Sequence, residues 1–283
     1  MEKFKIVTDS SSDLLSVDGV AFAYASLKII TAEKQYIDNA DLDVKAMVET
    51  LATYKGKSST SCPNPDDWLR AFGDARYVFC ITITGTLSGS HNSAMLAKRL
   101  YEEKYPDRQV FVINSLSTGP EMKLIAEYIR EMILRNEDYE NICSKATEYM
   151  QHTGLLFMLE SMRNLANNGR IRSVVAKAVG ILGIRIVGVA SEVGDLQLLD
   201  KCRGQQKALA AMFNRMKEFG FDGGRVRLAH CFNENAAETL KNMILAEFPD
   251  SDVEMYTCRG LCGFYAEKSG MLVGFEKNYQ SII

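Results

Sequence analysis

The sequence contains no hydrophobic run long enough to cross a lipid bilayer. A membrane-spanning helix needs roughly 20 consecutive apolar residues, and no segment of the 283-residue chain approaches that length. The opening residues, MEKFKIVTDSSS, enter a strand-like segment directly, where a signal peptide would have an apolar stretch. We therefore expect a cytoplasmic protein with no stable membrane insertion.

The chain also lacks an excess of positive charge. Its 33 lysines and arginines are outnumbered by 36 aspartates and glutamates, which leaves a net charge of −3. A protein that binds nucleic acid usually carries surplus cations that neutralise the phosphate backbone. The composition therefore argues against nucleic acid as a partner.

Residues that bind metals or form disulfides are few and scattered. The seven cysteines are an odd number without C-x-x-C spacing, and the three histidines lie far apart in the sequence. Disulfide frameworks and zinc sites need paired or clustered ligands, and only Cys258 and Cys262 are close. We expect reduced thiols, no metal and no cofactor.

The first half of the chain alternates short apolar segments with longer amphipathic ones. The apolar segments are residues 5–8, 77–83 and 110–114, and the amphipathic ones are residues 42–54, 88–104 and 118–135. Strands that are apolar throughout are typical of sheets buried on both faces. The recurring order of strand, loop and helix predicts a mostly parallel sheet with flanking helices.

The second half changes character near Thr153. We expect helices at 205–219 and 236–248, and strands at 154–161, 184–193, 195–202, 225–231, 253–258 and 271–275. Gly194-Asp195 signals a hairpin turn, so this sheet should be mixed. Because 283 residues can form two domains, the sequence predicts an α/β fold with an N-terminal domain at residues 1–152 and a C-terminal domain at residues 153–283.

Four loops of the predicted first domain are rich in hydroxyl side chains. They span residues 8–13, 58–63, 84–90 and 115–119. Taken singly, Asp9, Ser88 and Thr118 can each be nothing more than an N-cap of the following helix. Ligands of parallel sheets bind at the carboxyl ends of the strands, and four loops together supply more donors than helix ends require. They indicate a site for an anion or a carboxylate.

Two enzymatic uses of these loops have weaker support. The segment GTLSG at residues 85–89 departs from the G-x-S-x-G nucleophile elbow, and no catalytic triad can be placed around Ser88. Asp9 and Asp13 could hold magnesium for phosphotransfer, yet the chain has no G-x-x-x-x-G-K-[ST] motif. A small-molecule phosphotransfer or hydrolytic enzyme that uses the same cleft is the alternative hypothesis.

Five blocks, in this order, resemble the signature blocks of the DegV family. They are IVTDSSSDL from residue 6, TSCPNP from residue 60, LSGSHNSA from residue 87, NNGRI from residue 167 and KCRGQQKAL from residue 201. The resemblance implies a two-domain DegV-like fold and a bacterial, non-catalytic lipid-binding protein. Such a protein binds a long-chain fatty acid and presents its carboxylate to a fatty acid kinase for phosphorylation.

The resemblance also implies which residues form the site. Hydroxyls of the T-S-x-P and L-S-G blocks, here Thr60, Ser61 and Ser88, are expected to hold the carboxylate between the domains. The alkyl chain is expected to enter the C-terminal domain. A basic residue of the R-G-x-x-K-A block, here Arg203, is expected to contact the kinase, although it can equally be a solvated residue at a helix start.

One segment departs from the family pattern. Members of the family carry a histidine in an H-x-G-P-G segment that touches the carboxylate, whereas residues 258–264 read CRGLCGF. Arg259 is the candidate replacement because a guanidinium is a permanently charged, forked donor, and Cys258 is the other residue at that place. An arginine paired on the surface at a helix start is an equally good interpretation.

An alkyl tail requires an apolar tunnel. Burying a methylene is worth about 0.8 kcal/mol, so roughly ten buried methylenes would contribute on the order of 8 kcal/mol before the costs of binding. The main candidates for acyl contact are Phe157, Met158, Ile186 and Phe264, and further candidates are Leu155, Met162, Ile181, Leu182, Val189 and Met271. Taken singly, each of these residue types belongs more often to the ordinary core than to a ligand site.

Overall fold

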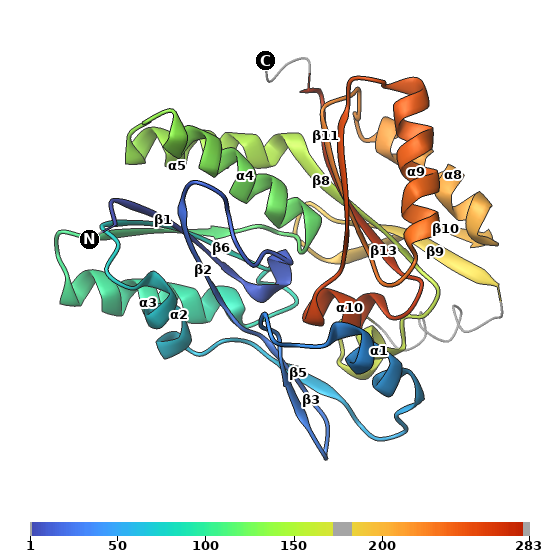
Figure 1. The fold of residues 1–283 in the computed structure, drawn as a ribbon, viewed down its shortest axis with the longest axis horizontal. Helices are drawn as coiled ribbons and strands as arrows, with labels where there is room; N and C mark the ends of the chain where they lie inside the picture. Colours follow the sequence, from blue (N-terminus) through green and yellow to red (C-terminus); the bar gives the residue numbers. More distant parts are fainter. Residues whose placement is uncertain (1, 172–182, 280–283) are drawn as a thin grey trace.

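The computed structural model describes residues 2–171 and 183–279, and the strands of these residues form three sheets (Figure 1). A four-stranded parallel sheet has the order β2-β1-β6-β7 and consists of β1 (Phe4–Asp9), β2 (Ala21–Ala25), β6 (Tyr77–Thr82) and β7 (Gln109–Asn114). A small antiparallel sheet has the order β4-β3-β5 and consists of β3 (Lys28–Ile30), β4 (Gln35–Ile37) and β5 (Ser59–Ser61).

The third sheet is mixed and has the order β10-β9-β8-β13-β11-β12. Only β11 and β12 pair in parallel, and the other neighbours are antiparallel. The strands are β8 (Thr153–Leu159), β9 (Ile184–Ala190), β10 (Leu196–Arg203), β11 (Arg225–His230), β12 (Asp252–Thr257) and β13 (Met271–Glu276).

Helices cover both faces of the parallel sheet (Figure 1). One face is covered by α2 (Pro65–Phe72) and α3 (Ser90–Lys104), and the other by α4 (Pro120–Leu134) and α5 (Tyr139–Tyr149). The short helices η1 (Ser10–Ser12) and η2 (Met150–His152) follow β1 and α5. Because successive strand residues point to opposite faces, Ile6 packs on the α4 side and Val7 on the α3 side.

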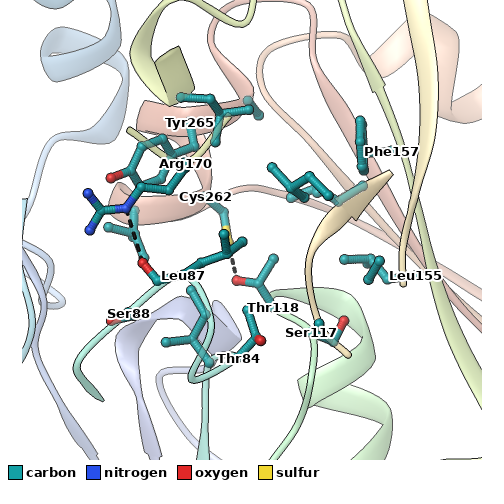
Figure 2. Close-up of a pocket in the computed structure, with 18 of the residues that line it drawn as sticks. Thr84, Leu87, Ser88, Ser117, Thr118, Leu155, Phe157, Arg170, Cys262 and Tyr265 are labelled. Atoms are coloured by element: carbon teal, nitrogen blue, oxygen red, sulfur yellow. Dashed lines mark hydrogen bonds between the residues drawn. The ribbon is translucent and has the colours of Figure 1, made fainter. Parts of the chain in front are cut away.

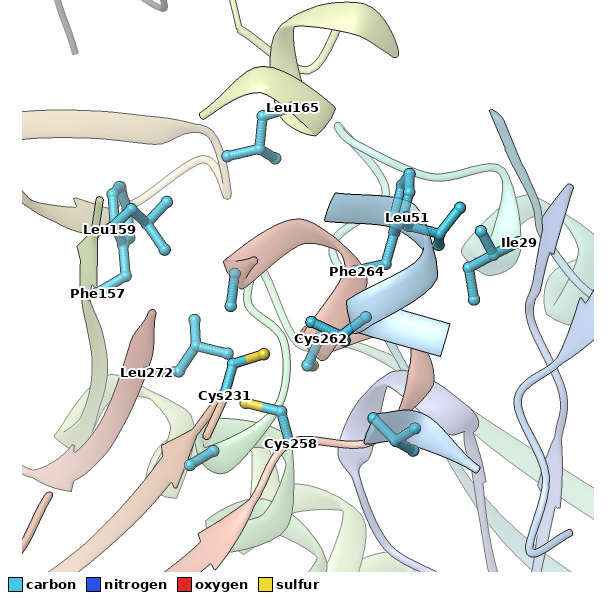
Figure 3. Close-up of a cluster of buried hydrophobic side chains, with 14 of the residues drawn as sticks. Ile29, Leu51, Phe157, Leu159, Leu165, Cys231, Cys258, Cys262, Phe264 and Leu272 are labelled. Carbon is cyan, nitrogen blue, oxygen red and sulfur yellow. The ribbon is translucent and has the colours of Figure 1, made fainter. Parts of the chain in front are cut away.

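The mixed sheet also has two differently covered faces. One face packs against α8 (Gln205–Glu218) and α9 (Glu234–Glu247). The other face meets α10 (Gly260–Ala266), α1 (Val44–Thr53) and α6 (Arg163–Asn167), around the apolar cluster in Figure 3. Along β8, Leu155, Phe157 and Leu159 point to this second face, whereas Leu156 and Met158 point to α8.

Several contacts join the parallel and mixed sheets. Helix α4 packs against strands of both. Asp38 accepts hydrogen bonds from the backbone N–H groups of Gly260 (2.8 Å) and Leu261 (2.9 Å) at the start of α10. Arg227 of β11 pairs with Glu127 of α4 at 2.8 Å. The loops of the first sheet are therefore held against the second sheet.

The predicted parallel first sheet and mixed second sheet are confirmed, as is the hairpin at Gly194. The small antiparallel sheet, β2 and α5 were not predicted. The strands of the small sheet are three residues long, too short to show the alternation of a strand. The domain boundary between residues 152 and 153 stays a prediction. Within the described ranges, no helix combines the length and the apolar character needed to cross a membrane.

Candidate functional site

A cavity lies between the loops of the parallel sheet and one face of the mixed sheet (Figure 2). Together with its open mouth, the cavity encloses about 800 Å³ of space between the side chains that line it. The floor of the cavity is apolar and comes from β8, the β9–β10 hairpin and β13: Leu155, Phe157, Leu159, Ala190, Leu196 and Leu272.

Three of the four hydroxyl-rich loops form the opposite wall. The β5 strand contributes Thr60, the loop after β6 contributes Thr84 and Ser88, and the loop after β7 contributes Ser117 and Thr118. The loops after β6 and β7 lie at the carboxyl ends of neighbouring parallel strands, where ligand sites of such sheets are found. Thr60 comes from the small antiparallel sheet. The parallel sheet therefore supplies hydroxyls to the cavity, and the mixed sheet supplies hydrocarbon.

Arg170 and Tyr265 lie together at one end of the cavity, here called the polar end, whereas Ser117 lies near Leu155 (Figure 2). The hydroxyls of Thr60 and Tyr265 are hydrogen-bonded at 2.7 Å, and Arg170 Nε donates to the Leu87 carbonyl oxygen at 3.0 Å beside Ser88 (Figure 2). No ion pair joins Arg170 to a carboxylate anywhere in the described part of the chain. A guanidinium beside hydroxyl donors is suited to bind a carboxylate.

The polar end is also the end that reaches solvent. Thr60, Ser88 and Arg170 are partly exposed, whereas Leu155 and Phe157 are 2% and 1% exposed. In Figure 2, Arg170 and Ser88 lie on the opposite side of the cavity from these two residues. A ligand with an anionic head and an apolar tail would fit with its head at the mouth.

The two acidic groups of the lining, the Tyr265 phenol and the Cys262 thiol, stay neutral. Burial raises the pKa of the Tyr265 phenol, and it raises the pKa of the Cys262 thiol well above its ordinary value. Neither group therefore supplies a negative charge or a ready nucleophile at neutral pH. Along the described lining, the charged side chain is the cation Arg170.

The fourth hydroxyl loop, residues 8–13, does not line the cavity, and its side chains make hydrogen bonds that stabilise the fold. Asp9 caps η1 through the backbone N–H of Ser11. Its Oδ2 atom also accepts hydrogen bonds from the Ile83 N–H (3.0 Å) and the Ser90 hydroxyl (2.6 Å). Burial raises the pKa of Asp9. Asp9 therefore acts as a cap, and it ties together the two ends of the loop that carries Ser88.

Side chains that could bind a metal ion are not clustered in the described ranges. Among residues 2–171 and 183–279, no group of three or more histidine, cysteine or carboxylate side chains is arranged to hold a metal ion. Asp13 instead accepts a hydrogen bond from the Arg259 backbone N–H at 2.9 Å. Asp9 and Asp13 thus both have structural partners.

The structure brings together two of the four predicted carboxylate ligands. Thr60 and Ser88 line the cavity. Ser61 follows Thr60 in β5, so its side chain points to the opposite side of the strand and is absent from the lining. The Arg259 guanidinium donates to the Asn39 carbonyl oxygen and does not line the cavity either. The geometry therefore favours Thr60 and Ser88 over Ser61 and Arg259.

Of the four main acyl-chain candidates, one lines the cavity and three do not. Phe157 lines the cavity, and so does the further candidate Leu155. Met158 points to the opposite face of the sheet because strand side chains alternate. Ile186 belongs to the same apolar cluster as Phe157 but lies outside the lining. Phe264 lies beside Leu51 of α1 (Figure 3) and borders a separate hollow.

The other candidates lie elsewhere. Ile181 and Leu182 are outside the described residues. Met162, Val189 and Met271 pack in the hydrophobic clusters without lining the cavity. These positions could not be distinguished in advance, since apolar residues occupy both faces of the strands.

Two residues of the polar end were not predicted. Arg170 lies in the NNGRI block, which the sequence analysis identified without assigning its arginine a role. Tyr265 lies 205 residues from its partner Thr60, and no local pattern indicates such a contact. Arg203, the predicted partner contact, is exposed at the end of β10 and lies outside the cavity.

Comparisons with known proteins agree with this geometry. The model of the DegV family matches residues 3–278. A DegV domain-containing protein of Streptococcus pneumoniae is 41% identical over 277 residues, which cover 96% of this chain and 99% of that protein. A DegV domain-containing protein of Streptococcus gordonii is 38% identical over the same length.

Two solved structures are similar over almost the whole chain. A DegV family protein from Eubacterium eligens, loaded with heptadecanoic acid, has a TM-score of 0.95 and 39% identity. The Fatty Acid Kinase (Fak) B3 protein of Streptococcus pneumoniae, loaded with linoleic acid, has a TM-score of 0.95 and 40% identity. Each comparison covers 97% of this chain and 99% of the other. The predicted α/β fold is confirmed by both.

Proposed function

Because the chain belongs to the DegV family, we propose that it is a cytoplasmic, non-catalytic carrier that binds one long-chain fatty acid and presents the carboxylate to a fatty acid kinase. The observation that carries this proposal is the cavity, whose apolar floor ends at Thr60, Ser88 and Arg170. Two similar proteins hold heptadecanoic acid and linoleic acid. Both ligands combine one carboxylate with a long alkyl chain, as the cavity requires.

The energetics support a tightly held ligand. Roughly ten methylenes buried on the apolar floor contribute on the order of 8 kcal/mol before the costs of binding, so the tail supplies most of the driving force. The carboxylate must then be satisfied, because an unpaired anion in an apolar site is costly. Arg170 and the hydroxyls of Thr60 and Ser88 lie where they can do this.

Presentation to a kinase is supported by the position of the polar end. Thr60, Ser88 and Arg170 are partly exposed, so a carboxylate bound there lies near the surface. The tail meanwhile lies against buried residues such as Phe157. A partner could therefore reach the reacting group without removing the tail from the protein.

The test of lipid binding is mass spectrometry of organic extracts from the purified protein. We expect a fatty acid at about one per chain, and the delipidated protein should rebind oleate. Ala190→Trp, which fills the cavity, should lose the ligand. Val193→Trp is the control, since Val193 in the same hairpin is 61% exposed. An extract without fatty acid, together with no rebinding, would exclude the carrier; magnesium-dependent turnover of a small substrate would then favour the enzymatic alternative.

The test of the partner contact uses charge reversal at Arg203. Arg203→Glu should weaken phosphorylation of the bound fatty acid by the kinase while leaving lipid affinity unchanged, because Arg203 is exposed outside the cavity. Arg99→Glu, on the exposed face of α3, is the matched control. Equal phosphorylation by both variants would reject Arg203 as the contact.

A further inference from the structure

Phe157 and Gly188 face each other across neighbouring strands. They are directly paired in the antiparallel register of β8 and β9, and directly opposed residues project from the same face of a sheet. That face is the floor of the cavity, which Phe157 lines. On its other side Phe157 pairs with Leu272 of β13, which also lines the cavity.

The Phe157 ring occupies the space above Gly188. A Cβ atom at residue 188 would lie 2.2 Å from Phe157 Cζ and 2.6 Å from Phe157 Cε2. It would also lie 2.6 Å from the backbone oxygen of Gln197 in β10. Carbon atoms in contact are normally about 3.5–4.0 Å apart, so the ring lies on the sheet only because residue 188 has no side chain.

We infer that Gly188 sets the length of acyl chain that the cavity accepts, by allowing the Phe157 ring to withdraw from the cavity onto β9. This inference rests on the proposed function. Gly188 itself does not line the cavity, so it is a positioning residue that acts through Phe157. The pair therefore determines how deep the apolar end is.

The direction of the effect follows from the surroundings of the ring. Phe157 has Leu155 and Leu159 on the same face of its own strand and Leu272 beside it on β13. A methyl group at residue 188 would require the ring tip to move by about 1.3 Å to reach ordinary contact distance. The ring is free to move only away from the sheet, into the cavity. The space lost there is space for the end of the tail.

The size of the effect follows from the transfer free energy of a methylene. Each methylene that no longer fits should weaken binding about fourfold. The loss should affect only chains long enough to reach Phe157, so shorter chains should bind as before. A change that depends on chain length separates this mechanism from general destabilisation, which weakens all chains alike.

The test is a competition among saturated acids from lauric to arachidic, in which native mass spectrometry reports the bound species. Gly188→Ala should shift the preference toward shorter acids, and Phe157→Leu should shift it toward longer ones. In the double variant the clash with the ring is gone, so its preference should equal that of Phe157→Leu, and an intermediate preference would contradict an action of Gly188 through the ring. If Gly188→Ala folds only in combination with Phe157→Leu, the double variant and Phe157→Leu alone should share one chain-length preference, and a difference between them would refute the role of Gly188.

The same sheet contains a matched control on its opposite face. Gly154 of β8 pairs with Phe275 of β13, and a Cβ atom at Gly154 would lie 3.3 Å from Phe275 Cζ. Phe275 packs in the cluster under α8 and α9 and does not line the cavity. Gly154→Ala and Phe275→Leu should therefore leave the chain-length preference unchanged.

The outcomes separate this inference from the proposed function. If wild type and variants all bind fatty acid with one common chain-length preference, the role of Gly188 is refuted and the carrier function stands. The same holds if Phe275→Leu shifts the preference as much as Phe157→Leu. If the wild-type protein binds none of the acids, the proposed function fails and the inference fails with it.

Discussion

Replacing Asp13 by asparagine should stabilise the protein, and the gain should grow with pH. Asp13 is 9% exposed, and its Oδ1 atom accepts the hydrogen bond from the Arg259 N–H just before α10. Burial and the nearby Asp38 carboxylate raise the pKa of Asp13 from 3.8 to about 8. Asparagine keeps the acceptor oxygen and tolerates the left-handed backbone at this residue, where φ is 60°.

The sign and magnitude follow from proton linkage. Between the two pKa values the folded state holds a proton that the unfolded state has lost, so the contribution of Asp13 to stability falls as pH rises from about 4 to about 8. At pH 7 the pH lies 3.2 units above the unfolded-state pKa of 3.8. At 1.36 kcal/mol per unit, the charge-free folded form therefore loses about 4 kcal/mol of its free energy of unfolding between pH 4 and pH 7. The asparagine side chain does not ionise in this pH range, so the variant does not lose this stability.

Urea unfolding of the delipidated wild type and Asp13→Asn, over a series of pH values, measures this effect. The free energy of unfolding of the variant minus that of the wild type should increase by about 4 kcal/mol between pH 4 and pH 7. Asp9 and Glu121 also have raised pKa values, but both proteins contain them and neither acts on Asp13, so their contributions cancel. A difference that does not change with pH would refute the reasoning.

Three further predictions concern the cavity itself. Arg170→Gln should weaken fatty-acid binding by about tenfold or more, because a hydrogen bond to a charged group is worth about 1.5–3 kcal/mol; calorimetry with oleate measures it, and unchanged affinity would remove Arg170 from the head-group site. Thr60→Val combined with Ser88→Ala should weaken binding by about 1–3 kcal/mol through lost polar contacts, with little change in melting temperature; equal affinity would reject both hydroxyls. Gly194→Ala should speed fatty-acid release, since its Cβ would lie 2.1 Å from Thr84 Oγ1 at a φ of +83° and displace the hairpin turn that borders the cavity; stopped-flow displacement that shows a wild-type release rate would contradict this.

The order of the strands and helices could be read from the sequence, because it depends on local periodicity. The apolar strands β1, β6 and β7 and the amphipathic helices between them follow patterns that a few residues define. The hydroxyl loops could be located for the same reason, since polar residues directly follow each strand. Parallel strands then bring the loops after β6 and β7 to one edge of the sheet, where Thr84, Ser88, Ser117 and Thr118 line the cavity.

The choice among neighbouring residues needed the three-dimensional structure. Strand β8 is apolar on both faces, so alternation alone could not tell Phe157, which faces the cavity, from Met158, which faces α8. Arg259 and Arg170 were both arginines next to glycine, and only folding directs the first to the Asn39 carbonyl oxygen and the second to the cavity.

The sequence by itself therefore determined the fold class, three strands of the parallel sheet, the strands of the mixed sheet and the hydroxyl loops, all of which arise from short-range patterns. Tertiary structure alone decided which side chains share the cavity. Thr60 meets Tyr265 across 205 residues, and the Phe157 ring lies above Gly188 of another strand. Such contacts depend on how sheets pack and pair, and no local pattern along one chain records that packing.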